Sequence, residues 1–223
     1  MTHPRLAVIH TVASVSEDIQ RRFAAAGLPE AKHVLDASLL DDLLAGVDPT
    51  DVERRLRAHV DALDCAEVVA LSCSSLTPIV RGIRSPHGAR IVTIDEPMAA
   101  IAVRYARLGV LCTSAATVAG STVLLERAAA AAGRHVQLSV CFVDGAYDRL
   151  RAGDRDEHDA LVLGAAADLA PDVDAVVLAQ ASLARLEPVI AAATGLPVLS
   201  SPDPFIAEIR AQLGLDEAAP GAP

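Results

Sequence analysis

The sequence predicts an α/β fold made of two pseudo-symmetric halves, each with a mostly parallel sheet flanked by helices. Apolar runs of strand length alternate with helix-length amphipathic segments, which is the rhythm of βαβ units. Of the 223 residues, 52% are hydrophobic but only 2% are aromatic, so Ala, Val, Leu and Ile must fill the core, as in strands covered by helices. Three sequence blocks also recur in the same order in the second half, which indicates a duplicated unit.

Strand-like and helix-like segments alternate through the first half. The strand-like runs are LAVIH, VVALS and IVTI at residues 6–10, 68–72 and 91–94, and the helical patterns cover about residues 17–26, 51–63 and 98–105. Each run has the length of a buried strand, and each helical pattern has the spacing of a helix with one apolar face.

The second half repeats three blocks of the first. The pairs are RLAVIHTVASV (5–15) with RLGVLCTSAAT (107–117), VVALSCSSLTP (68–78) with AVVLAQASLAR (175–185), and IVTIDEPM (91–98) with VLSSPDPF (198–205). The second pair places Gln180 at the position of Cys73, and the third places Asp203 at the position of Glu96. Three blocks in the same order predict that the halves share one fold.

The repeats also set the expected domain limits. We expect the first half to cover residues 1–98 and the second half residues 99–205. A helix at about residues 204–214 is expected to pack back on the first half. Residues 215–223, which end in DEAAPGAP, are expected to form a frayed tail.

Charge and hydropathy exclude several classes of partner. The formal net charge is −10, and there are no clusters of basic residues with interleaved aromatics, so neither nucleic acid nor an anionic membrane surface is expected as a partner. The start, MTHPRLAVIH, lacks the features of a signal peptide, and no run approaches the roughly 20 apolar residues of a membrane helix. We therefore expect a cytoplasmic protein.

No cofactor or metal is expected. The four cysteines have no C-x-x-C spacing, which argues against a structural zinc site and a disulfide framework. Lys32 is the only lysine and lies in a polar segment, a poor setting for a pyridoxal phosphate Schiff base. Neither G-x-G-x-x-G nor G-x-x-x-x-G-K-[ST] occurs, so nucleotide binding has no support.

Small polar residues follow the predicted strands in both halves. Ligands of open parallel sheets bind beyond the carboxyl ends of the strands. The residues there are His10, Thr11, Ser14, Cys73, Ser74, Ser75, Thr113, Ser114, Thr117, Gln180 and Ser182. Helix capping explains any one of them, whereas their recurrence in both halves favours a shared ligand, and hydroxyls and amides of this kind bind a carboxylate.

Cys73 is the candidate reactive residue. In SCSSLTP it stands where a strand passes into a helix, near the positive end of a helix dipole that stabilises a thiolate. The alternative is a buried, inert thiol. We expect Cys112 and Cys141, inside strand-like runs, and Cys65, at a helix end, to belong to the core.

Together, SCSSLTP after a strand, TSAAT after the midway strand, and the polar turn AQASLA resemble the aspartate/glutamate/hydantoin racemase superfamily over nearly the whole chain. The resemblance implies two Rossmann-like or flavodoxin-like halves with the active site in the cleft between them, no cofactor, and a homodimer or higher oligomer. In that family one cysteine from each half serves opposite faces of the substrate's α-carbon. One thiolate removes the proton and the other thiol supplies it.

The resemblance also implies roles for individual residues. Cys73 matches the first cysteine, and His10 lies where some members place a polar partner for it. Gln180 occupies the position of the second cysteine, and Glu96 is a candidate second acid or base, although a charged residue before a helix is commonly a dipole partner. The residues matched to substrate binding are Thr11, Ser74, Ser75, Thr113, Ser114, Thr117, Ala181 and Ser182.

Gln180 leaves three hypotheses, because an amide cannot exchange a proton at accessible pH. The first is a racemase or isomerase of a small carboxylate, such as an amino acid or its derivative, with Cys73 as acid and base. The second is a one-cysteine decarboxylase or lyase, or an isomerase of the maleate type in which the thiolate adds to a double bond. The third is a carboxylate-binding protein without catalysis.

Overall fold

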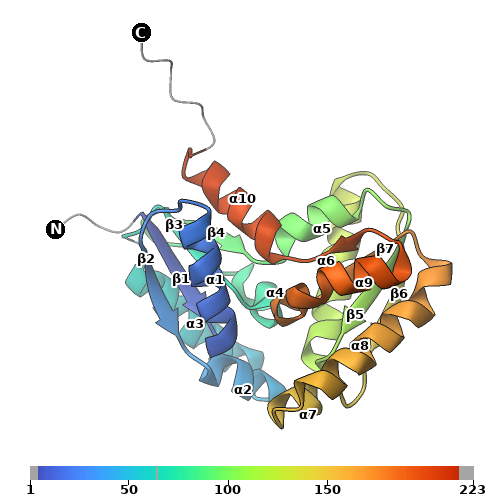
Figure 1. Ribbon diagram of the computed structural model, residues 1–223. Helices are drawn as coiled ribbons and strands as arrows, with labels where there is room; N and C mark the ends of the chain where they lie inside the picture. Colours follow the sequence, from blue (N-terminus) through green and yellow to red (C-terminus); the bar gives the residue numbers. More distant parts are fainter. Residues whose placement is uncertain (1–4, 64, 216–223) are drawn as a thin grey trace. The chain divides into compact units, whose positions relative to one another are not determined.

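The computed structural model describes residues 5–63 and 65–215 (Figure 1). The described residues form two compact units. One unit contains the residues up to Ile94 together with those from Pro202 onward, and the other contains Asp95–Ser201. Each unit is a four-stranded parallel sheet flanked by helices, which confirms the predicted fold class.

The sheet of the first unit has the order β2-β1-β3-β4, with every neighbouring pair parallel. Its strands are β1 (Leu6–His10), β2 (Ala31–Leu35), β3 (Val68–Leu71) and β4 (Arg90–Thr93). Its helices are α1 (Ala13–Ala25), α2 (Ser38–Leu44), α3 (Pro49–Leu63), the 3₁₀ turn η1 (Ser74–Leu76), α4 (Thr77–Val80) and α10 (Pro202–Gln212).

Strand alternation divides the interior of the first unit into two layers, because successive side chains point to opposite faces of a sheet. Ala7 and Leu71 point to the face that α2, α3 and α4 cover, where α3 contributes Val52, Leu56 and Val60 on one side of the helix. The opposite face is covered by α1 and α10, which contact each other and the strands. Both faces of the sheet are therefore buried.

The second unit repeats this architecture with the order β6-β5-β7-β8, again parallel throughout. Its strands are β5 (Arg107–Cys112), β6 (Gln137–Phe142), β7 (Ala175–Leu178) and β8 (Val198–Leu199). Its helical segments are α5 (Glu96–Ala102), α6 (Ala115–Ala131), α7 (Ala146–Arg151), α8 (Arg155–Leu169), η2 (Ala170–Asp172), η3 (Ala181–Leu186) and α9 (Glu187–Thr194). One apolar cluster joins α5 and α6 to one face of the sheet, and another joins α8 and α9 to the other.

The chain passes between the units at points that differ from the expected limits. The limit expected after residue 98 falls inside α5, whereas Met98, Ala99 and Ala102 are buried against β5 and β7, so all of α5 belongs to the second unit. The limit expected at residue 205 falls inside α10, which packs on β3, β4 and α1 of the first unit. The expected frayed tail, apart from Leu215, lies outside the described residues.

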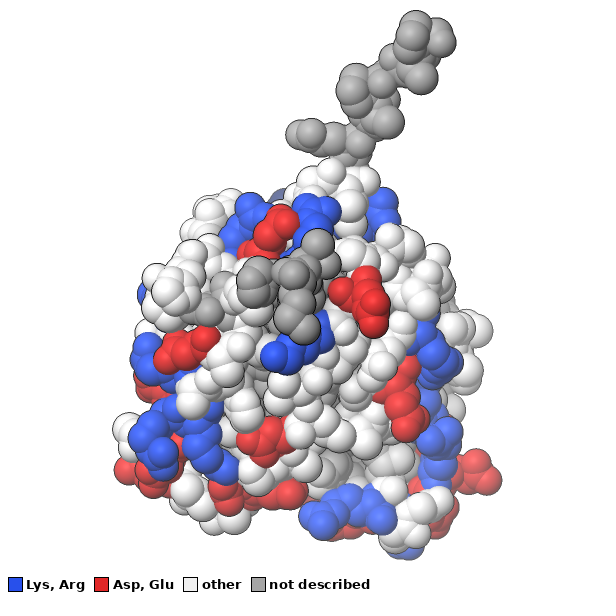
Figure 2. All heavy atoms as spheres, turned by 90° about the vertical axis from the view of Figure 1, so that its left-hand side faces the viewer, with Lys and Arg blue, Asp and Glu red and all other residues white. Residues whose placement is uncertain are grey.

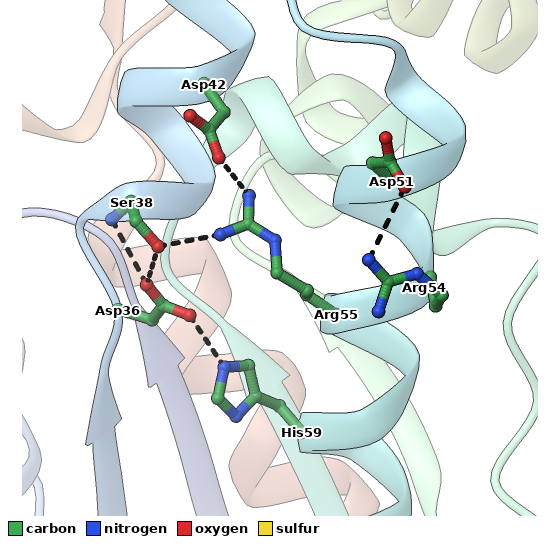
Figure 3. A network of polar contacts seen from close by, with 7 residues as sticks. All are labelled: Asp36, Ser38, Asp42, Asp51, Arg54, Arg55 and His59. Carbon is green, nitrogen blue, oxygen red and sulfur yellow. Dashed lines mark hydrogen bonds and ion pairs between the residues drawn. The ribbon is translucent and has the colours of Figure 1, made fainter.

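A polar network fixes the chain beyond the carboxyl end of β2 (Figure 3). The Asp36 carboxylate accepts hydrogen bonds from the Ser38 backbone N–H at 3.1 Å and from the His59 ring at 2.8 Å. Arg55 of α3 binds Ser38 and Asp42 of α2. Burial alone would raise the pKa of Asp36, but the hydrogen bonds from Ser38 and His59 outweigh it and lower the pKa below its usual value. The network joins α2 and α3 to the end of the strand.

Replacement of Leu56 tests the packing of α3 against the first sheet. It is fully buried, so Leu56→Ala should lower the free energy of unfolding by about 2–5 kcal/mol through lost burial and an incompletely filled cavity. The matched control is Leu44→Ala in α2, where the side chain is 37% exposed and the expected loss is under about 1 kcal/mol. Urea titration of both variants measures the difference, and equal losses would contradict the packing described for α3.

Candidate active site

The topology of each sheet selects one place for a ligand. In the order β2-β1-β3-β4 the connections turn in opposite directions from β1 and β3, and ligands of open α/β sheets bind beyond the carboxyl ends of such neighbouring strands. In the first unit these ends carry His10, Thr11 and Cys73. In the second unit, β5 and β7 occupy the same places and lead into Thr113 and Gln180. The structure thus defines two candidate half-sites, one at each edge.

Cys73 lies just beyond β3 in extended backbone, with φ −124° and ψ 111°. It is 8% exposed and belongs to the apolar cluster beneath α3 and α4. Ser74 and Ser75, which follow it, are half-buried. The helix expected after Cys73 is shorter than the sequence suggested, because the 3₁₀ turn η1 comes first and α4 contains only four residues. The helix-dipole contribution at the thiol is correspondingly smaller than we expected.

His10 is completely buried at the end of β1 and uses both ring nitrogens. Nδ1 lies 2.8 Å from Ser72 Oγ, and Nε2 lies 2.8 Å from His33 Nδ1. Burial, with a smaller contribution from the nearby His33, lowers the pKa of His10 to about 4. His10 is therefore neutral at pH 7. Its hydrogen bonds lead to Ser72, the residue before the candidate thiol.

Gln180, at the position where the resemblance places a second cysteine, is held by Thr113. Its Oε1 accepts hydrogen bonds from the Thr113 backbone N–H at 2.6 Å and from the Thr113 hydroxyl at 3.0 Å. Because a backbone N–H can only donate, the atom facing it must be the amide oxygen. The Gln180 NH₂ group then points away from this contact, and it has no hydrogen-bond partner within the described residues. Its two N–H bonds can serve an anionic ligand.

Ser114 also presents an unused polar group. It is the N-cap residue of α6, yet its side chain makes no capping hydrogen bond. Its hydroxyl is buried and has no partner among the described residues, and the residue is only 7% exposed. The capping explanation that the sequence allowed therefore fails for Ser114. A buried hydroxyl without a partner is costly in a protein interior, and a ligand at this edge would satisfy it.

The remaining sequence-predicted residues have less distinctive settings. Thr11 and Thr117 are buried, Ala181 and Ser182 are half-buried in η3, and Ser14 is exposed on α1. Glu96 is exposed at the first turn of α5, a position typical of a carboxylate that interacts with the helix dipole.

The other cysteines differ from Cys73 in position. Burial raises the pKa of Cys112 to about 12, with a further contribution from Cys141, so Cys112 stays a neutral thiol. The pKa of Cys141, on the edge strand β6, is also raised by burial. Cys65 is exposed, so the expectation that it belongs to the core is wrong, whereas Cys112 is buried and Cys141 partly buried. Cys112, the last residue of β5, lies directly before Thr113 at the second half-site and takes the place that His10 has in the first unit, whereas Cys65 and Cys141 do not follow β1, β3, β5 or β7.

Sequence reasoning missed the two residues that bind His10, Ser72 and His33. Ser72 stands inside the SCSS motif, but only its contact with His10 gives it a role. His33 lies on β2, next to Lys32 in the segment that the sequence analysis describes as polar. AKHVL does not alternate between polar and apolar residues, and its one large apolar pair, Val34 and Leu35, is too short to indicate a strand.

Neither a metal cluster nor a membrane span is found in the described part of the chain. No group of three or more His, Cys, Asp or Glu side chains there could hold a metal ion. No helix in residues 5–63 and 65–215 is both long and apolar enough to cross a bilayer. On the face shown in Figure 2, acidic and basic side chains are interleaved.

Comparison with known proteins supports the fold. No family model matches the sequence, and no curated protein matches it. Solved structures that share this α/β architecture include racemases of amino acids and of allantoin, in agreement with the fold that the sequence resemblance implied.

Three of these structures show the extent of the likeness. Glutamate racemase from Francisella tularensis, in complex with D-glutamate, has a TM-score of 0.72 and 9% identity, covering 100% of this chain and 86% of its own. Aspartate racemase from Picrophilus torridus has a TM-score of 0.70 and 11% identity over 94% of both chains. Allantoin racemase from Klebsiella pneumoniae has a TM-score of 0.67 and 15% identity over 95% and 88%. At such identities the likeness shows the fold alone.

The pKa of His10 predicts acid sensitivity. The ordinary value is 6.5 and the folded value is about 4, so the unfolded chain binds more protons between these two limits. The contribution of neutral His10 is complete above pH 6.5 and is lost as the pH falls toward 4, by up to about 3 kcal/mol. Urea titrations at pH 7 and pH 5 of the native protein and of His10→Gln measure it. Equal pH dependence in both proteins would contradict a buried neutral His10.

Solvent exchange of the Thr113 amide measures the hydrogen bond that it donates to Gln180. Gln180→Ala leaves the Thr113 N–H without its acceptor, so the second unit should lose about 1–3 kcal/mol, and the Thr113 amide should exchange faster with solvent. Gln180→Glu retains an acceptor oxygen and should preserve the slow exchange. Amide hydrogen exchange followed by NMR distinguishes the two variants. An unchanged Thr113 exchange rate in Gln180→Ala would show that this hydrogen bond does not form.

Proposed function

We propose that the chain is a cofactor-independent racemase or isomerase that acts on a small carboxylate, such as an amino acid or its derivative, with Cys73 as acid and base. One observation carries the proposal. The Gln180 NH₂ group and the Ser114 hydroxyl have no partner within the described residues and lie at the carboxyl edge of the second sheet, and Cys73 lies at the equivalent edge of the first sheet. The fold shared with glutamate, aspartate and allantoin racemases adds support.

The proposed chemistry begins with proton abstraction. The Cys73 thiolate takes the proton from the substrate's α-carbon, and the electron pair of the C–H bond passes into the carboxylate or carbonyl as an enolate. Hydrogen-bond donors directed at the developing charge stabilise such an intermediate. The Gln180 NH₂ group and the Ser114 hydroxyl are the proposed donors, because neither has a partner within the described residues. Ser74 and Ser75 are proposed to bind the substrate carboxylate.

Gln180 favours a second candidate reaction. An amide donates hydrogen bonds but supplies no proton at neutral pH, and His10 is neutral with both nitrogens engaged. A decarboxylase or lyase needs a proton on one face only. In decarboxylation the substrate would lose CO₂, the resulting carbanion would take the Cys73 S–H proton, and solvent would return a proton to the thiolate. In this second reaction Gln180 would stabilise the carbanion by hydrogen bonding.

The Cys73 chemistry is tested by proton NMR in D₂O with aspartate, glutamate, hydantoins, allantoin, maleate and arylmalonates. We expect an α-proton signal to disappear with the native protein, and the rate to fall by roughly 10²–10⁴-fold in Cys73→Ala, as for loss of a positioned acid–base group. Cys65→Ala, which removes an exposed thiol, should retain the native rate. The same spectra identify the product and so separate a racemase from a lyase.

The reverse replacement tests the part played by Gln180. If the missing second thiol limits the native protein to one face, Gln180→Cys should gain racemisation of the substrate that exchanges. Exchange in Cys73→Ala at the native rate would refute the role of Cys73. Binding of a carboxylate without any exchange, in the native protein and in both variants, would instead establish the binding-protein hypothesis.

A further inference from the structure

A small cavity lies between the end of α1 and the start of β2 in the first unit. Its volume is about 260 Å³, and Gln20, Phe23, Glu30 and His33 are among the residues that line it. His33 is partly exposed there. Its Nδ1 is bound to His10, whereas its Nε2 has no hydrogen-bond partner in residues 5–63 and 65–215. His33 thus has one nitrogen bound inside the protein and another that can bind water in the cavity.

A continuous hydrogen-bonded chain runs from this cavity to the residue before Cys73. His33 Nδ1 lies 2.8 Å from His10 Nε2, and His10 Nδ1 lies 2.8 Å from Ser72 Oγ. The two rings are stacked, with centroids 5.1 Å apart and planes 25° from parallel. Phe23 packs against His33 with centroids 6.4 Å apart. His10 and Ser72 are buried, so the chain crosses the interior from the cavity to the carboxyl edge of β3.

This chain has two arrangements of its protons. In one arrangement His33 Nδ1–H donates to His10 Nε2, His10 Nδ1–H donates to Ser72 Oγ, and the Ser72 hydroxyl donates onward at the edge. In the other, Ser72 O–H donates to His10 Nδ1, and His10 Nε2–H donates to His33 Nδ1. Both arrangements satisfy every hydrogen bond and leave both imidazoles neutral, since each neutral ring has one donor and one acceptor.

We propose that His33, His10 and Ser72 form a proton relay that connects water in the α1–β2 cavity with the reacting groups at the carboxyl edge of the first sheet. The part of the relay that concerns catalysis rests on the proposed function. A proton that enters at His33 Nε2 releases the Nδ1 proton to His10 Nε2, and His10 releases its Nδ1 proton to Ser72 Oγ. Ser72 then gives its own hydroxyl proton to a base at the edge. One proton enters, one leaves, and the chain changes from the first arrangement to the second.

The relay would behave differently in a racemase and in a decarboxylase. Passage of a proton in the opposite direction restores the first arrangement. A racemase that removes and returns a proton through the relay would reset it in each cycle, whereas a decarboxylase would need both rings and the hydroxyl to reorganise after every turnover. His33 is a positioning and relay residue, because it touches neither the substrate nor Cys73 in this assignment.

The relay is tested first without a substrate. In protein labelled with ¹⁵N-histidine, NMR measures how fast the His10 ring N–H exchanges with water. The relay predicts rapid exchange in the native protein despite complete burial, and exchange slower by at least about tenfold in His33→Gln, because the Gln amide can hydrogen-bond to His10 but cannot pass a proton. His135→Gln, which replaces an exposed histidine, is the matched control and should leave the rate unchanged.

A chemical rescue gives a second readout. His33→Ala enlarges the cavity, and added imidazole should restore the exchange of the His10 ring N–H toward the native rate. Imidazole would not restore the rate if His33→Ala acted only by disturbing the structure. Once D₂O exchange has identified a substrate, His33→Gln should lower its turnover by roughly 10- to 100-fold, with little change in KM. This loss is no larger than the smallest loss expected on removing a positioned acid–base group.

The outcomes distinguish failure of the relay from failure of the proposed function. Native His10 exchange in His33→Gln, or absence of rescue in a folded His33→Ala protein, would overturn the relay whatever reaction occurs. Slowed exchange with rescue, but without Cys73-dependent turnover of any compound tested, would leave the relay established and would count against the proposed reaction. Unchanged turnover in His33→Gln would overturn the catalytic use of the relay.

Discussion

Burial of both faces of each parallel sheet is the constraint on which the rest of this structure depends. Strands such as β1 and β3 are apolar on both sides, so a polar side chain near them must find a partner or lie at an edge. At the carboxyl edge of the first sheet, His10 meets this requirement through Ser72 and His33. At the same edge of the second sheet, Gln180 meets it through Thr113, and Ser114 does not meet it at all. The Ser114 hydroxyl, which has no partner among the described residues, therefore supports a ligand at the carboxyl edge of the second sheet.

The duplicated units carry different chemistry on the same framework. β3 leads into Cys73 and β7 leads into Gln180, at equivalent positions of sheets with the same strand order. The backbone conformations agree as well, since Cys73 has φ −124° and ψ 111° and Gln180 has φ −135° and ψ 137°. The Cys73 thiol can exchange a proton and the Gln180 amide cannot. The two sheets therefore share one framework but differ in acid–base chemistry.

Much of the fold could be predicted from the sequence, because apolar runs and their repetition are local signals. LAVIH coincides with β1, and the repeat aligned β1 with β5 and β3 with β7 in the observed order. The edge strand β2 was not predicted, since an edge strand is only half-buried and the exposed positions of AKHVL are Lys32 and Leu35, so burial does not follow polarity along it. The candidate residues could be predicted, but not their partners. The His10–His33 contact depends on how β1 pairs with β2, which no local pattern reveals.

The helices that follow β4 and β8 are exchanged between the units, since α5 packs with the second unit and α10 with the first. In α10, Phe205 is fully buried and contacts Phe23 of α1, with ring centroids 6.2 Å apart. The first unit is therefore assembled from two segments, one before and one after the residues that form the second unit. During synthesis, which usually favours folding of the N-terminal domain first, the second unit can here be completed before α10, which the first unit needs, has left the ribosome.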